Sequence, residues 1–226
     1  MTHQTKAPLS AEALGAPESH FQPAGAMSWP AQLIAVASIA VELGAVVVVA
    51  KEISLAAANA KAIAFRAGDK AKGFLPITDF INELAKDTIG KVTTINELAL
   101  LLFMMTVHDH RKTVAYNKIA QATKLTGKAI YAESIQKALD TAKIRVQDCR
   151  REFKRDVALL TDHLEEVLRN AQTAQTIAIY SRIEASQAGE YLQSLQTVAE
   201  SVDNAAQAIH NNVQHCLIVL SAFKNS

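Results

Sequence analysis

The stretch "RAGDKAKGF", Arg66–Phe74, interrupts a long run of helix-forming residues with glycine. A second stretch, "QAGEYLQSL", Gln187–Leu195, repeats its order of small residue, glycine and acid, and the leading glycines of the two stretches, Gly68 and Gly189, are 121 residues apart. Gly127 in "TKLTGKA" divides that interval almost evenly. Glycine takes the left-handed backbone conformation that commonly ends a helix. The sequence therefore predicts three chain reversals that join four helices.

Apolar and small residues recur in steps of three and four along three segments, which is the period of coiled-coil packing. The first segment contains Phe74, Ile77, Ile81, Leu84, Thr88, Val92, Ile95, Ala99 and Leu102. The second contains Leu139, Ala142, Val146, Cys149, Phe153, Val157, Leu160, Leu164, Val167, Ala171, Ala174 and Ala178, with one extra step of four after Phe153. The third contains Leu192, Leu195, Ala199, Val202, Ala206, Ile209, Val213, Cys216 and Leu220.

These patterns predict an all-α fold, a long antiparallel four-helix coiled-coil bundle made of two tandem helical hairpins. Hairpin one covers residues 29–126 and hairpin two residues 128–226, after a flexible N-terminal tail at residues 1–28 that is rich in proline and glycine. The spacing of the glycines predicts helices of matched length, which at 1.5 Å per residue form a rod roughly 85–90 Å long.

Composition narrows the function. Half of the 226 residues are hydrophobic, only 5% are aromatic, and the formal net charge is +1. A chain with this balance buries a core and carries no overall field to attract nucleic acid. Cys149 and Cys216 fall on apolar helical positions, so we expect buried, reduced thiols in a cytoplasmic protein.

One apolar segment, Ala31–Ala50, is long enough to span a bilayer, and a second, Leu98–Val107, is shorter. Glu42 near the middle of the first segment and its many small residues weigh against a membrane span. Mutual burial in the bundle core explains both segments without lipid. The valine run at residues 46–49 favours a strand over a helix and leaves a membrane-inserting tongue open.

The segment Asn59–Thr88, "NAKAIAFRAGDKAKGFLPITDFINELAKDT", resembles the cytoplasmic hairpin tip of bacterial chemoreceptors, the methyl-accepting chemotaxis proteins. The matching residues are Asn59, Arg66, Ala67, Gly68, Gly73, Phe74, Asp79, Leu84 and Ala85. The segment Arg182–Val202 is similar to the same pattern at Ile183, Glu184, Ala185, Ala188, Gly189, Glu190, Val198, Ala199 and Val202. In that family two hairpins from two chains form a four-helix dimer, so the resemblance implies such a dimer duplicated and fused in one degenerate chain.

The resemblance also implies a partner-binding tip without catalytic or cofactor-binding residues. In the family, residues before the turn join receptor dimers, and the acid and aromatic positions after it contact a histidine kinase or coupling adaptor. Carried over residue by residue, the implied tip residues are Asn59, Arg66, Asp69, Phe74, Glu184, Gln187 and Glu190. The copies depart from the pattern, with Ile63 where the first needs a glutamate, and with Tyr180, Gln187 and Leu195 at the Asn, Arg and Phe positions of the second.

Enzymatic and metal-binding functions find no support in the sequence. His108 and His110 in "HDH" lie about 200° apart around a helix and cannot chelate one metal from it, so we expect a solvated polar patch. The run Arg150–Asp156, "RREFKRD", is expected to be a solvated face around a buried Phe153. The glycine spacing of Arg66–Phe74 does not fit a phosphate-binding loop.

Two hypotheses follow. The first is a cytoplasmic, non-enzymatic signalling or scaffold protein that acts through its tip on chemoreceptor-type coiled coils, a histidine kinase or a coupling adaptor, or on itself. The second is a membrane-associated or secreted helical protein, such as a pore-forming toxin component, that uses residues 31–50 and 98–107. Neither requires a cofactor or a metal.

Overall fold

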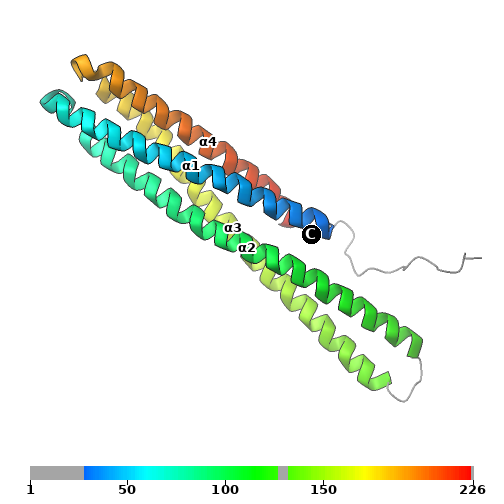
Figure 1. The fold of residues 1–226 in the computed structure, drawn as a ribbon. Helices are drawn as coiled ribbons and strands as arrows, with labels where there is room; N and C mark the ends of the chain where they lie inside the picture. Colours follow the sequence, from blue (N-terminus) through cyan, green and yellow to red (C-terminus); the bar gives the residue numbers. More distant parts are fainter. Residues whose placement is uncertain (1–27, 127–131, 225–226) are drawn as a thin grey trace, which may run out of the picture.

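The computed structural model describes residues 28–126 and 132–224 of the chain. All regular secondary structure in these residues is helical. The chain runs through α1 (Trp29–Ala67), the short 3₁₀ helix η1 (Gly68–Ala71), α2 (Phe74–Thr126), α3 (Ala132–Ala185), η2 (Gly189–Tyr191) and α4 (Leu192–Lys224) (Figure 1). The third predicted reversal, at Gly127, lies outside the described residues.

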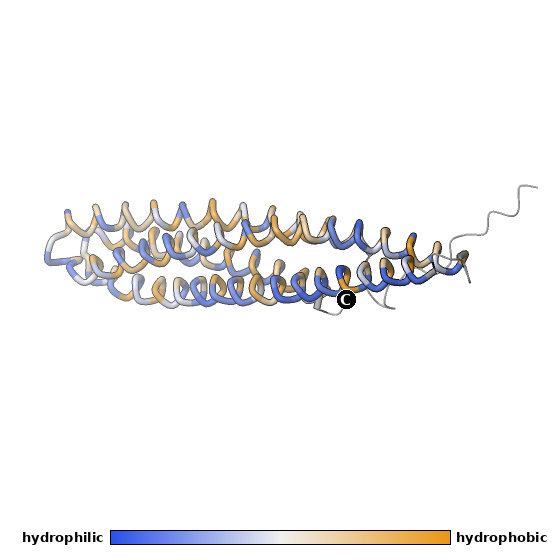
Figure 2. Tube along the Cα trace, turned by 90° about the horizontal axis from the view of Figure 1, so that it is seen from below, coloured by the Kyte–Doolittle hydropathy of each residue, from blue (hydrophilic) through white to orange (hydrophobic). Residues whose placement is uncertain are grey.

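The helices form an antiparallel four-helix bundle, as the sequence predicts. Each helix packs against two others, in the cyclic order α1, α2, α3, α4. The η1 and η2 turns lie side by side at one end of the rod, which we call the tip (residues 59–74 and 180–195) (Figure 1). Hydrophobic and hydrophilic residues alternate along each helix (Figure 2).

The prediction of four matched helices is wrong. Whereas α2 and α3 contain 53 and 54 residues, α1 has only 39 and α4 only 33. The start of α1 therefore reaches only His110 of α2, on which Trp29 stacks with ring centroids 4.3 Å apart. Beyond this level α2 and α3 continue as a two-helix extension (Figure 1). At 1.5 Å per residue the longest helix measures about 80 Å.

The predicted seams of α3 and α4 are confirmed within the four-helix section. Every α4 position from Leu195 to Leu220 in the seam is buried, and so are the α3 positions from Val157 to Ala178. Phe153 is only half-buried, against Phe223 at 5.7 Å between ring centroids, because α4 ends there and leaves one side of the ring uncovered. On α2 the sequence predicted that Ile77 and Leu84 are buried in the core. Instead, these two residues are half-buried, and their neighbours Thr78 and Ala85 are buried.

Buried positions in the first hairpin recur 121 residues later in the second. The ten buried residues of α1 are Val36, Ile39, Leu43, Val46, Ala50, Ile53, Ala57, Ala60, Ala64 and Ala67, and the residues 121 positions further on are buried as well. The same holds between α2 and α4, where Phe74 corresponds to Leu195 and Leu102 to Phe223. The two hairpins thus present the same inward register to a common core.

The glycine positions explain how both hairpins turn. Gly68 has φ 58° and ψ −131°, and Gly189 has φ 60°. Side chains rarely tolerate this backbone region, because the Cβ atom collides with the neighbouring carbonyl. Gly68 caps the end of α1, whereas α3 ends at Ala185, and each glycine opens a 3₁₀ turn at a chain reversal that the sequence predicts.

The run Arg150–Asp156 is not wholly solvated. Asp156 is 4% exposed and accepts a hydrogen bond from Arg155 Nε at 3.0 Å. The extra step of four between Phe153 and Val157 turns position 156 towards the core, because it shifts the inward face of α3 around the helix.

Candidate functional site at the tip

The structure exposes most of the predicted tip residues. Asn59, Arg66, Asp69, Gln187 and Glu190 are exposed, and Glu184 is half-buried. They come from two hairpins far apart in the sequence, and the bundle brings them to one end of the rod.

Phe74 is the exception, and the contact role that the resemblance implies for it does not fit its position. Its side chain is fully buried in a small core beneath the turns. The other buried members of this core are Ala60, Ala64, Ala67, Ala71, Ala185, Ala188 and Leu195. Alanines let the helix backbones approach closely, and the Phe74 ring fills the space that remains between them.

Charges link the two turns only weakly. Lys70 of η1 approaches Glu190 of η2, with 3.9 Å between Nζ and Oε1, and both side chains are mostly exposed. Exposed pairs of this kind contribute at most about 1 kcal/mol. The ion pairs Lys61 with Asp79 and Arg182 with Asp203 join the arms of each hairpin just behind the tip. The other charged side chains of the tip, such as Arg66 and Asp69, therefore contribute little to the stability of the fold.

Glu184 has a contact that the sequence does not reveal. A Cβ atom built on Gly73 would lie 1.9 Å from Glu184 Oε1, so the carboxylate rests directly over this glycine. Gly73 has no positive φ, and its missing side chain serves this close approach instead. Within the described residues, no ion pair joins Glu184 to Arg66.

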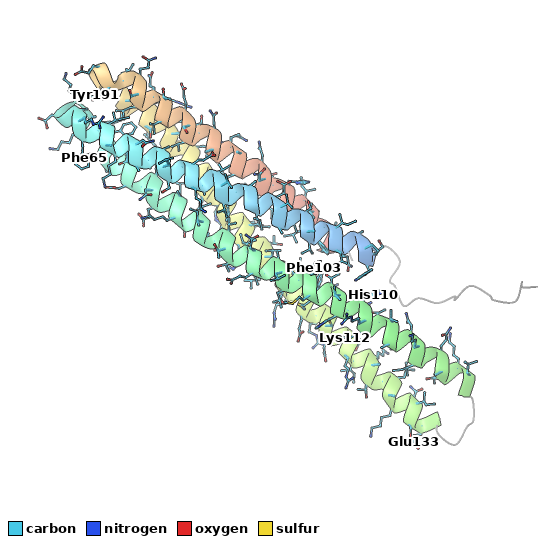
Figure 3. All side chains as sticks on the ribbon, viewed as in Figure 1. Phe65, Phe103, His110, Lys112, Glu133 and Tyr191 are labelled. Carbon is cyan, nitrogen blue, oxygen red and sulfur yellow. The ribbon has the colours of Figure 1, made fainter. Side chains whose placement is uncertain are left out.

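Sequence reasoning missed the apolar part of the tip surface. Phe65 is 65% exposed beside Arg66, and on α3 Tyr180 and Ile183 are also mostly exposed. Figure 3 places Phe65 at the tip end of α1, near Tyr191 of the other turn. The detectable signal was an aromatic residue at an outward heptad position, next to a charge. Apolar and charged groups therefore share the exposed end of the rod.

A shallow groove between α2 and α3 has a volume of about 550 Å³. Lys91 stands in it between Asp87 and Glu166, at 3.3 Å from each. Burial opposes the charge of Lys91, but hydrogen bonds and attraction from these two carboxylates outweigh it and raise the pKa of Lys91. Lys91 in turn lowers the pKa of Glu166. Lys91 thus pairs with two carboxylates of the groove. Within residues 28–126 and 132–224 no group of three His, Cys, Asp or Glu side chains is arranged to hold a metal.

The "HDH" patch is less solvated than expected, because Trp29 at the start of α1 covers part of it. His110 stacks against Trp29, and Asp109 lies 3.6 Å from Arg150 Nε across to α3. Only His108 is exposed. Burial raises the pKa of Asp109, against the lowering effect of the charges on Arg150, Lys112 and His110.

Asp109→Asn is therefore expected to raise the thermal midpoint at neutral pH. A carboxyl whose folded pKa is raised stabilises the fold below its unfolded pKa and loses that contribution as pH rises through the folded value. The gain should shrink when the pH falls below the ordinary carboxyl range. Thermal melts of Asp109→Asn and of the exposed control Asp162→Asn at both pH values check this. A lower midpoint for Asp109→Asn at neutral pH would show that the Arg150 pair outweighs the burial.

The two long apolar segments are helical and only partly covered. By length and composition α1 and α2 could each cross a membrane, which alone is weak support for a membrane protein. The valine run 46–49 lies inside α1, so the strand that its composition favours does not form here. Mutual burial in the core accounts for only one side of these segments, since Ile34, Val41 and Leu100 are exposed.

The two cysteines are free and buried, as the sequence predicts. Burial raises the pKa of Cys216 to about 12 and that of Cys149 less strongly, so both thiols stay protonated and unreactive in the fold.

The bundle thus presents an end surface that is assembled from two similar turns. Comparisons with models of protein families, with curated protein sequences and with solved structures found no significant match to this chain.

Proposed function

We propose that this protein is a non-enzymatic signalling or scaffold protein that acts through its tip on other coiled-coil proteins of the chemoreceptor signalling type. The observation that carries the proposal is the pairing of two glycine turns at one end of a four-helix rod, with Lys70 beside Glu190. Two fused hairpins of the kind that the sequence resembles would have this geometry. The recurrence of buried positions at a spacing of 121 residues supports an internal duplication.

The composition of the tip surface suits protein recognition. Interfaces favour aromatic and arginine side chains, and at the tip Phe65 and Arg66 of α1 and Tyr180 of α3 are exposed. Charge complementarity across an interface determines the choice of partner more than it determines the affinity. We assign the partner-binding role to Asn59, Arg66, Asp69, Gln187 and Glu190, and Glu184 borders them. The partners are a chemoreceptor-type coiled coil, a histidine kinase or a coupling adaptor.

Arg66→Glu is expected to abolish binding to a purified cytoplasmic signalling fragment of a chemoreceptor while helicity by circular dichroism stays unchanged. Reversing an exposed charge changes folding stability by about 0.5 kcal/mol or less, but it places like charges together at an interface. Surface plasmon resonance with the immobilised fragment measures the effect. The control is Arg151→Glu at an exposed arginine far from the tip, and this variant should bind as the wild type does.

The result can also contradict the proposal. If wild type binds and Arg66→Glu binds equally well, Arg66 has no part in recognition and the role assigned to the tip fails. If wild type binds neither the receptor fragment nor a purified kinase or adaptor, the proposed class of partner is wrong.

The alternative, a membrane-active helical protein that uses residues 31–50 and 98–107, draws on a different surface. The exposed side chains of Ile34, Val41 and Leu100 favour it. Arg150, Arg151 and Arg155 on α3 weigh against immersion of the rod, because they lie on the neighbouring faces of the same section. Sedimentation with liposomes distinguishes this alternative.

A further inference from the structure

The outer face of α1 carries a second heptad pattern that the fold leaves uncovered. The residues of this α1 stripe are Ile34, Ala37, Val41, Gly44, Val48, Lys51, Leu55, Ala58, Ala62 and Phe65, and all ten are exposed. The four large aliphatic residues recur every seven positions and are exposed by 57–75%. Only Lys51 is charged. A helix that is apolar all round is normally buried all round, so the α1 stripe needs a cover.

The second hairpin shows that the bundle itself does not require this stripe. The positions 121 residues later form the matching α3 stripe, with Arg155, Ala158, Asp162, Glu165, Arg169, Gln172, Thr176, Ile179, Ile183 and Ser186. These residues are also exposed, and most of them are polar or charged. One of two equivalent faces is therefore built for water, and the other is built for an apolar neighbour.

Gly44 lies on the α1 stripe and leaves room for close approach by that neighbour. It lies inside α1 without a positive φ, and a Cβ atom added to it would meet nothing within 4 Å. No contact within the chain thus explains a residue that destabilises a helix interior relative to alanine. Small residues on a helix face permit a second helix to pack closely against the backbone. In the α1 stripe Gly44 lies between two larger residues, Val41 and Val48.

Neighbouring residues of α2 widen the apolar face. Leu100, Phe103 and Met104 are exposed, and α2 packs directly against α1. Figure 3 shows Phe103 on α2 beside the first part of α1. The α1 stripe is about 45 Å long, and with the α2 residues its ridged surface is comparable to the roughly 800 Å² that each partner buries in a stable dimer.

We propose that a second copy of this chain covers the face, with the two α1 stripes packed antiparallel about a two-fold axis level with residue 46. In this register Ile34 faces Ala58 of the other copy, Val48 faces Gly44, and Leu55 faces Ala37. Each of these contacts sets a large residue against a small one. In the same register Val41 faces Lys51, whose aliphatic stem covers the valine while its ammonium group reaches solvent at the edge. The two-fold axis repeats each contact. Such self-complementarity is what an isologous interface requires.

The same observations disfavour lipid as the cover. A bilayer does not select a heptad alternation of large and small residues, and the α1 stripe continues past Lys51 and Glu52 to Phe65. A second α1 stripe, in contrast, matches its period over residues 34–58.

Light scattering coupled to size exclusion tests the proposal on the full chain. Wild type should elute at twice the 24.4 kDa mass of one chain. Leu55→Lys should raise the dimer dissociation constant by roughly a hundredfold, because it buries unpaired ammonium groups in the interface. Thr176→Lys, at the matching position of the α3 stripe, should leave the dimer intact. Circular dichroism should show all three proteins equally helical.

Cysteine cross-linking tests the register. A mixture of Ile34→Cys and Ala58→Cys chains should form a disulfide-linked pair under mild oxidation, whereas Ile34→Cys alone should not. The native thiols are buried and do not interfere. Cross-linking of Ile34→Cys with itself overturns the proposal in favour of a parallel pair.

Three other results overturn it. The first is a wild type that stays monomeric at micromolar concentration and sediments with liposomes, together with a Leu55→Lys variant that does not sediment. This result would mean that the face binds lipid. The second is a monomer that dimerises only after deletion of residues 1–27, which makes that segment the cover. The third is a dimer that Leu55→Lys leaves unchanged, which places the interface elsewhere.

Discussion

Leu160→Ala is expected to lower the free energy of unfolding by about 3–5 kcal/mol, the upper part of the range for large-to-small changes in a core. The Leu160 side chain is fully buried and belongs to the main core cluster of the four-helix section. Close packing around it by all four helices leaves little room for the site to collapse. Urea denaturation followed by circular dichroism measures the change.

Two comparisons make this prediction sharper. Leu159→Ala is the matched control, because Leu159 is the exposed neighbour on the same turn, and its truncation should cost less than about 1 kcal/mol. Phe153→Ala should fall between the two, since its ring is half-buried at the end of α4. Equal losses for Leu159→Ala and Leu160→Ala would mean that α3 does not have the inward register described above.

Gly68→Val is expected to destabilise the bundle by about 2–3 kcal/mol, the upper part of the cost of a non-glycine residue in sparsely populated backbone space. The combination of φ 58° and ψ −131° excludes a β-branched side chain, and the turn cannot relax without moving two long helices. Thermal and urea denaturation of the full chain measure the loss.

The control for Gly68→Val is a glycine with the opposite expectation. Gly90 is helical, has no positive φ, and a Cβ atom added to it would meet nothing within 4 Å. Gly90→Ala should therefore stabilise the protein by about 0.4–1 kcal/mol through the entropy of the unfolded chain. If Gly68→Val proves as harmless as Gly90→Ala, the backbone at the turn differs from the one described.

The sequence predicted the fold where local and long-range preferences coincide. The steps of three and four in α3 and α4 are a property of each helix alone, so the buried residues from Leu195 to Leu220 could be named in advance. The glycines at positions 68 and 189 likewise indicate places where the backbone takes a positive φ. The steps of three and four do not reveal the unequal helix lengths, because the ends of α1 and α4 leave no mark on α2 and α3, which continue through that level. The predicted start of hairpin one at residue 29 already implied a first helix shorter than the second.

The candidate site was less predictable for the same reason. Exposure of Arg66 and Glu190 follows from their place beside a turn, but the burial of Phe74 depends on how four backbones converge at the tip. The cover that Trp29 gives His110 joins residues 81 positions apart, and no local pattern encodes it. The carboxylate of Glu184 over Gly73 is a contact of this kind too, since it spans the two hairpins.

The step from four helices to two also makes the rod a beam of uneven cross-section. Resistance to bending rises steeply with the width of a beam, so α2 and α3 flex far more readily past the Trp29 and Phe223 rings than they do beside α1 and α4. A sideways load on the two-helix extension is therefore absorbed as curvature at this shoulder. The stiff section beyond it holds the two turns in fixed relation, so strain applied at one end of the molecule does not distort the other.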